Sequence, residues 1–185
     1  MKKKKILKII IGVFAVIAIL VICVGMYLKY FLPNIKIKDL KVAVTNERIE
    51  KGKYLANHVL VCVDCHSIRD WSRYSGPIVH GTEGMGGEIF DQKIGLPGKY
   101  ISANITPYYL ASWSDGEIYR AITSVVGKRN NTIFPVMPFE AYGTLDDEDI
   151  SCVIAYIRSI PLIKNDIPVS ESDFPVNFLI NTMAK

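Results

Sequence analysis

The pentapeptide Cys62-Val63-Asp64-Cys65-His66 constrains this chain more than any other feature of its sequence. Two thiols three positions apart lie on one turn of a helix, and the adjacent imidazole can project from the same side. Such thiols can both reach the vinyl groups of one porphyrin, and C-x-x-C-H is the attachment signature of c-type haem. The motif therefore predicts that Cys62 and Cys65 bind one haem c covalently and that His66 is an axial ligand of its iron.

Two other chemistries also use paired cysteines. Thioredoxin-like exchange needs the C-x-x-C motif after a strand in a βαβ pattern, whereas here it follows a predicted helix. A zinc site needs four ligands, and the sequence has no second C-x-x-C and no spaced histidine pair. His58 and His80 are too scattered to complete such a site. Both alternatives stay open, and haem is favoured over them.

A haem iron in an electron carrier needs a second axial ligand, usually Met or His. We expect Met137 to be this ligand, because two prolines stiffen its surroundings in the segment Phe134-Pro135-Val136-Met137-Pro138-Phe139. The plain alternative for a lone methionine is core packing. Rival ligands are His80 and Met85, the latter within the glycine-rich stretch 83–87.

The chain carries no charge from Ile9 to Leu28 and is almost wholly apolar there. A helix of this length covers roughly 30 Å, the thickness of the hydrocarbon layer. The lysines that precede it place the N-terminus in the cytoplasm. A cleaved signal peptide would have a shorter apolar core and a small-residue cleavage site, and large Ile22 before Cys23 disfavours lipoprotein processing. We expect a basic tail over 1–8 and an uncleaved transmembrane helix over 9–30.

The charge of the chain is unevenly distributed. Residues 1–32 hold six lysines and no acid, whereas residues 33–185 hold 16 basic and 18 acidic side chains. A nucleic-acid-binding domain would show a basic stripe, which the exported part lacks. The basic excess is a membrane signal, and we expect no nucleic-acid partner.

Beyond the apolar run, the sequence indicates helices joined by long loops. Residues 31–45 are expected to form an extended stalk, and Asn46 can cap a helix from about Glu47 to Val59. The stretch 67–111 shows no sustained periodicity, and only something as large as a haem would order it. Two Ser/Thr-x-x-acid patterns, at 114–117 and 144–147, predict helices that end near Gly127 and near Ser159. Residues 162–185 read as an extended strap.

Residues 47–168 resemble the single-haem class I cytochrome c domain, and more closely the haem domains that accompany bacterial membrane-bound dehydrogenases. The resemblance implies an all-α cytochrome c fold, with three to five helices and long loops around one haem, in addition to the transmembrane helix. We place this domain at 46–168 and a C-terminal strap at 169–185. The matching residues, besides Cys62–His66, are Gly52–Ala56, Asn104–Pro107, Trp113–Ile122, Phe134–Phe139, Tyr142 and Ala155–Ser159.

The same resemblance implies roles for single residues. Gly52 would allow a close crossing of the first helix with Tyr156 in the last helix. The carbonyl of Pro77 would accept the His66 N–H and orient the ring. Three further residues are expected to line the haem pocket or meet its propionates, with ordinary packing as the alternative: Asn104, Trp113 and Tyr142. The segment Ser67–Gly98 is longer than in minimal members of the family, and the stretch 83–87 has no evident role.

With both axial positions filled, a haem can only cycle between Fe(III) and Fe(II), so we expect an electron carrier that is not itself an enzyme. Its partners would be a dehydrogenase, an oxidase or another cytochrome. The anchor places it in a bacterial inner membrane, spanning once, with the haem domain on the periplasmic side. The alternatives are a haem subunit of one membrane dehydrogenase complex, and a haem sensor or peroxidase with an open distal site.

Overall fold

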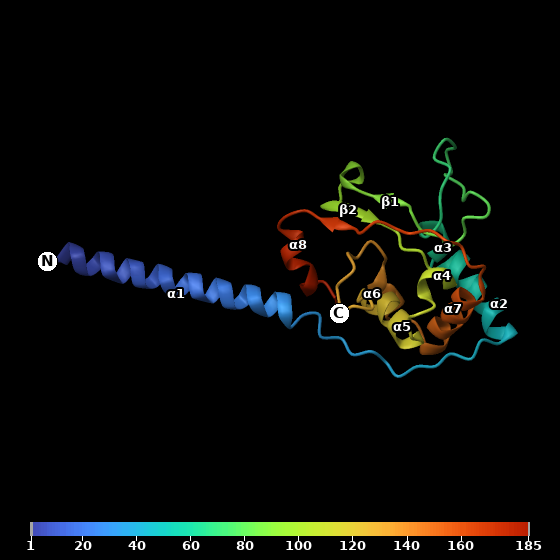
Figure 1. Cartoon of the computed structure of the whole chain (residues 1–185), viewed down its shortest axis with the longest axis horizontal. Helices are drawn as coiled ribbons and strands as arrows, with labels where there is room; N and C mark the ends of the chain where they lie inside the picture. Colours follow the sequence, from blue (N-terminus) through green and yellow to red (C-terminus); the bar gives the residue numbers. More distant parts are fainter. Residues whose placement is uncertain (1, 185) are drawn as a thin grey trace.

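A computed structural model describes residues 2–184, in which a long N-terminal helix stands beside a domain of shorter helices and long loops (Figure 1). The domain also contains a small antiparallel sheet. The elements are α1 (Lys2–Tyr30), α2 (Asn46–Tyr54), the π-helix η1 (Leu55–Val59), α3 (Cys62–Cys65), β1 (Ile89–Phe90), the 3-10 helix η2 (Gln92–Ile94), β2 (Gly98–Ile101), α4 (Pro107–Leu110), α5 (Asp115–Ser124), α6 (Phe139–Tyr142), α7 (Asp147–Ser159), β3 (Glu171–Ser172), α8 (Val176–Leu179) and the 3-10 helix η3 (Ile180–Thr182).

Helix α1 contains the apolar run. Within residues 2–184 it is the one helix that is long and apolar enough to cross a membrane, with a mean hydropathy of 3.2 over its most apolar stretch. None of that stretch is buried against the protein, although many of its side chains are large and apolar. By length and composition, α1 therefore fits the anchor expected from the sequence.

The segment 31–45 has no regular structure, as expected, but it is not a free stalk. It lies along α5, where Val42 donates its N–H to the Asp115 carboxylate at 2.8 Å and the carbonyl of Ile35 accepts from Arg120 at 2.9 Å. A Cβ atom on Gly116 would meet the carbonyl oxygen of Lys38 at 1.9 Å. This close approach requires a glycine on α5. It holds the segment 31–45, called the linker below, against the domain.

The core is built where α2 crosses α7, the most extensive helix contact in the domain. Helix α7 contributes four buried apolar residues to the core: Ile150, Val153, Ile154 and Ile157. At the crossing, a Cβ atom on Gly52 would lie 1.9 Å from the carbonyl oxygen of Cys152 and 2.9 Å from the Cβ of Tyr156. The crossing implied by the family resemblance is thus present, and Cys152 approaches Gly52 even more closely than Tyr156.

Replacing Gly52 by alanine is expected to lower the free energy of unfolding by about 3 kcal/mol, because the added methyl group can only be accommodated by moving α7. Lys53→Ala, an exposed change on the same helix, should alter it by less than about 0.5 kcal/mol. Denaturant unfolding followed by circular dichroism measures both. Equal stability of the two variants would show that the crossing is not as tight as described.

The helix ends differ in part from the sequence expectations. The capping box of Ser114 with Glu117 is present, with Ser114 accepting from the Glu117 N–H at 3.2 Å. Helix α2 is capped by Thr45, one residue before Asn46, because the Thr45 hydroxyl accepts from Arg48. Helix α5 ends at Ser124, where Val125 adopts a left-handed conformation, and not at Gly127. Thr144 does not cap α7, because its hydroxyl donates to the carbonyl of Ala141.

The all-α expectation and the structureless region at 67–111 both need correction. Strands β1, β2 and β3 form one antiparallel sheet in that order, pairing Phe90 with Tyr100 and Lys99 with Glu171. The strap is extended only as far as β3, after which α8 and η3 fold against the end of α1 (Figure 1). The loop region is therefore ordered in part by pairing of its strand β2 with β3 of the strap. Such pairing between segments far apart in the sequence is not visible in sequence periodicity.

Candidate haem-binding site

The segment that carries the cysteine pair has a distorted backbone. The π-helix η1 ends at Val59, Val61 has a positive φ of 48°, and the four residues Cys62–Cys65 then form the short helix α3. A β-branched residue with positive φ is a genuine outlier, and such strain is typical of functional sites. The distortion allows a new helical turn to start at Cys62, with both thiols on it.

The two cysteines are free thiols in a partly buried position. Burial raises the pKa of Cys62 to about 12 and also raises the pKa of Cys65. A thiol–disulfide exchange site works through a thiolate of lowered pKa. These thiols are protonated at neutral pH, so the site does not favour the thioredoxin-like alternative.

The imidazole of His66 is held by a backbone carbonyl. Its Nδ1 lies 2.7 Å from the carbonyl oxygen of Ala103. A carbonyl only accepts hydrogen bonds, so Nδ1 carries the proton and Nε2 keeps a free lone pair. Burial lowers the pKa of His66, which also favours the neutral ring. His66 is therefore in the form that can ligate a metal, with its other nitrogen fixed in the manner typical of metal-binding histidines.

The prediction that Pro77 holds His66 is wrong in this structure. The carbonyl of Pro77 accepts from the N–H of Asp70 at 2.8 Å, within a long loop that starts after His66. The two ends of this loop meet where the N–H of Gly86 donates to the carbonyl of His66 at 2.8 Å. The expectation placed the bonding carbonyl about a dozen residues after His66, at Pro77. In the structure a longer loop follows His66, and the carbonyl beside the imidazole is that of Ala103.

The glycine-rich stretch 83–87, to which the sequence assigns no role, lies at the base of this loop, where its two ends meet. Gly84 donates to the buried hydroxyl of Ser67 at 3.0 Å, and Gly87 donates to the carbonyl of Ser102 at 2.9 Å. Gly86 has a φ of +72°, and a Cβ atom there would lie 2.5 Å from the carbonyl carbon of Ala103. The stretch therefore supports the residue that holds His66.

Met137 lies in a segment fixed at both ends. Before it, Phe134 stacks on Tyr100 of β2, with ring centroids 3.9 Å apart. After it, α6 begins at buried Phe139. Met137 is partly buried, and both Met137 and Cys62 pack against the same apolar core cluster, as does Trp113. The proposed distal ligand and the first proposed haem-attachment residue thus border the same core.

Tyr142 joins these two sides of the site. Its buried hydroxyl donates to the carbonyl of Leu60 at 2.6 Å, which links α6 to the residue just before the strained Val61. The Asn104 side chain is hydrogen-bonded within the protein. It is 1% exposed, donates to the carbonyl of Ile163 at 2.9 Å and accepts from Thr106. Asn104 therefore ties the strap to the domain and has no side-chain atom left for a propionate.

Tyr142→Phe removes the donor to Leu60 and is expected to lower the free energy of unfolding by about 1–2 kcal/mol at neutral pH. Burial raises the pKa of Tyr142 from 10.0 to about 12. The unfolded chain then loses this proton first, so the tyrosine's contribution to stability falls as pH rises from 10 to 12. The difference between the parent and the variant should shrink over this range in denaturant titrations.

The matched control is Tyr74→Phe, because the Tyr74 side chain is wholly exposed. This change should leave the free energy of unfolding within about 0.5 kcal/mol of the parent at all these pH values. A stability difference for Tyr142→Phe that stayed constant from neutral pH to pH 12 would contradict the role given to burial.

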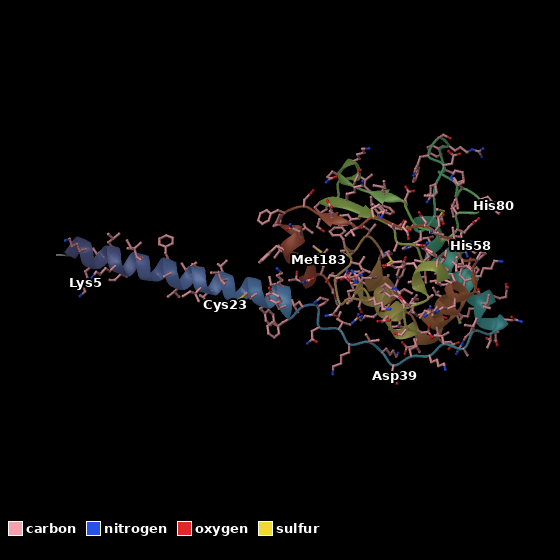
Figure 2. The ribbon with its side chains drawn as sticks, viewed as in Figure 1. Lys5, Cys23, Asp39, His58, His80 and Met183 are labelled. Carbon is pink, nitrogen blue, oxygen red and sulfur yellow. The ribbon has the colours of Figure 1, made fainter. Side chains whose placement is uncertain are left out.

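The rival ligands are less well placed. The His80 side chain is fully exposed and pairs with Glu83 at 3.2 Å, and His58 is exposed beside Tyr54 (Figure 2). Met85 is partly buried at the base of the loop. Across residues 2–184, no group of three or more His, Cys, Asp or Glu side chains is arranged to hold a metal ion. The cysteine pair is therefore not part of a four-ligand zinc site of such side chains.

Paired thiols on one helical turn, followed by a histidine whose ring is fixed through Nδ1, are the arrangement expected of a c-type cytochrome. The family comparison agrees. The chain belongs to the cytochrome c family, whose model matches residues 49–161. The family's domain carries haem c, and the residues present fit that group.

Similar proteins are named as cytochrome components of dehydrogenases. The chain is 28% identical over 111 residues to the gluconate 2-dehydrogenase cytochrome c subunit of Pantoea cypripedii, covering 58% of this chain and 22% of that protein. It is 28% identical over the same length to the alcohol dehydrogenase (quinone) cytochrome c subunit of Gluconacetobacter polyoxogenes, covering 58% and 21%. Against the fructose dehydrogenase cytochrome subunit of Gluconobacter japonicus the identity is 26% over 138 residues, covering 71% and 25%. The chain thus spans 25% or less of the length of these relatives.

Proposed function

We propose that this protein is a membrane-tethered electron carrier that holds one haem c through Cys62 and Cys65, with His66 and Met137 as axial ligands. The observation that supports this most is the position of Cys62 and Met137 against one core cluster, with the His66 ring fixed by Ala103. When bound, the haem supplies one-electron chemistry between Fe(III) and Fe(II). The chain itself provides ligation and orientation, and it limits access of water.

The likeness to dehydrogenase subunits supports a more specific role, that of a haem subunit which takes electrons from one membrane dehydrogenase. The three relatives above are each named for a dehydrogenase. In that case an oxidoreductase activity would belong to the complex and not to this chain. Otherwise the electrons pass between respiratory partners, a dehydrogenase on one side and an oxidase or another cytochrome on the other.

The anchor supports a single-pass protein of the bacterial inner membrane, with its N-terminus in the cytoplasm and its haem domain in the periplasm. The lysines precede α1, and the domain follows it. We keep the divisions of the chain at 1–8, 9–30, 31–45, 46–168 and 169–185 as a proposal. Tethering raises the effective concentration of the haem domain near other membrane complexes, which gives the anchor a physical purpose.

The test is reversible redox cycling of the full chain in detergent. The purified protein should be reduced by dithionite and reoxidised by ferricyanide with full recovery of its visible spectrum, and the reduced form should not bind carbon monoxide. Carbon monoxide binding by the unmodified protein would instead indicate an open distal site and a sensor or peroxidase. Co-purification of a dehydrogenase from gently solubilised membranes would separate the dedicated subunit from the general carrier.

A further inference from the structure

The C-terminal segment 174–183 packs against the end of α1 that faces the domain. A Cβ atom on Gly25 would lie 3.1 Å from the ring of Phe178, and the amide of Asn181 donates to the carbonyl of Leu28 at 3.2 Å. Figure 1 shows α8 beside the end of α1, and Figure 2 shows Met183 in the same place. The segment therefore has a fixed position relative to the apolar helix.

The contact with Gly25 sets the depth of this segment. Gly25 lies inside the apolar run, one helical turn before Lys29, the first charge after it. The four-residue step from Gly25 to Lys29 corresponds to about 6 Å along the helix. If α1 spans the bilayer, Lys29 marks the level of the headgroups, and Phe178 lies at or just below that level.

The chemistry of the segment fits that depth. Phe174 is 84% exposed and Phe178 48% exposed, which is unusual for rings of this size. Both line a hollow together with Lys29, Asn177 and Asn181. Aromatic rings mixed with lysine and amide side chains are typical of the membrane–water interface, where apolar and polar atoms are both satisfied.

The end of α1 continues this surface. Tyr30 and Phe31 are 72% and 67% exposed, and Phe31 stacks on Tyr27 at 5.6 Å. Exposed apolar side chains therefore come from two distant parts of the sequence to one end of the domain. Several large apolar side chains exposed near one end of a domain are typical of an interaction site.

We propose that the segment 174–183 is a second membrane contact, seated in the headgroup layer of the bilayer that α1 spans. This rests on the proposed membrane anchoring of α1. The linker fixes one side of the domain through its bonds to α5. The C-terminal segment fixes another side through its contacts with α1 and with lipid. The haem domain is then docked on the membrane in one orientation, not tethered loosely above it.

The experiment is site-specific photo-crosslinking of the full chain in vesicles of phosphatidylethanolamine and phosphatidylglycerol. A photoreactive phenylalanine analogue replaces one aromatic residue at a time: Phe174 as the test, Phe14 within the apolar run as the positive control, and Tyr74 on a distant exposed loop as the negative control. Each variant is first checked for its haem spectrum, and lipid adducts are then identified by mass spectrometry.

Lipid adducts at positions 14 and 174, and their absence at 74, are the expected result. Adducts at 14 but not at 174, or crosslinks from 174 only to a second copy of the chain, would overturn the membrane contact while leaving the anchor intact. An absence of lipid adducts at 14 would overturn the anchor, and the second contact with it.

Discussion

Cys65→Ser is expected to remove most of the covalently bound haem when the protein is expressed with an intact haem-attachment system. The serine hydroxyl cannot form a thioether, so at most one of the two bonds predicted from the motif remains. Haem staining of denaturing gels, normalised to the amount of protein, measures the loss.

The chain offers matched controls for the thiol itself. Cys152 is buried in α7 and Cys23 is exposed on α1. Cys23→Ser and Cys152→Ala should both keep the full haem stain, although the second removes a buried side chain and is expected to cost stability. A normal haem yield from Cys65→Ser would contradict attachment through the pair.

Met137→Ala is expected to keep the haem attached but to open the sixth coordination position. The reduced variant should bind carbon monoxide, whereas the reduced parent should not. Its reduction potential should fall by on the order of 100 mV, because methionine ligation raises the potential and axial ligands have large effects on it. Spectroelectrochemistry and a carbon monoxide difference spectrum provide the two measurements.

Met85→Ala is the matched control, because Met85 is also partly buried and was the rival methionine. It should leave carbon monoxide binding and potential unchanged. If instead Met85→Ala opened the sixth coordination position of the iron and Met137→Ala did not, Met85 would be the distal ligand in place of Met137. The segment Phe134–Phe139 would then have a packing role against Tyr100 and the core.

The sequence predicts those parts of the site that depend on neighbouring residues. Cys62, Cys65 and His66 are recognised by their spacing alone, and the capping box at Ser114 is a local pattern that the structure confirms. Gly52 was found through the family resemblance, and its close contact with Cys152 gives the physical reason for a glycine there. Local chemistry and spacing are sufficient for such features.

Features that depend on distant backbone atoms could not be found in this way. Ala103 holds His66 through a carbonyl, and nothing in an alanine side chain signals that role. The prediction of Pro77 failed because the length of the loop after His66 is visible in the sequence but its path is not. The one available signal was the neighbouring match at Asn104–Pro107, which places this stretch near the haem without indicating which atom matters.

The linker and the C-terminal segment show the same limit. Residues 31–45 have the composition of a stalk, yet their backbone groups bond to Asp115 and Arg120 of α5. The tail has prolines and apolar residues typical of an extended strap, yet α8 and η3 form where they contact α1. Contacts between segments so far apart in sequence leave no periodic pattern in either one.

The most direct test of the central claim is a pyridine haemochrome spectrum of the purified full chain, combined with acid-acetone extraction. The account predicts the spectrum of a haem whose two vinyl groups are saturated, at one haem per chain, with the colour staying in the protein precipitate. A colourless protein, or pigment that passes into the acetone, would contradict the bonding of haem to Cys62 and Cys65.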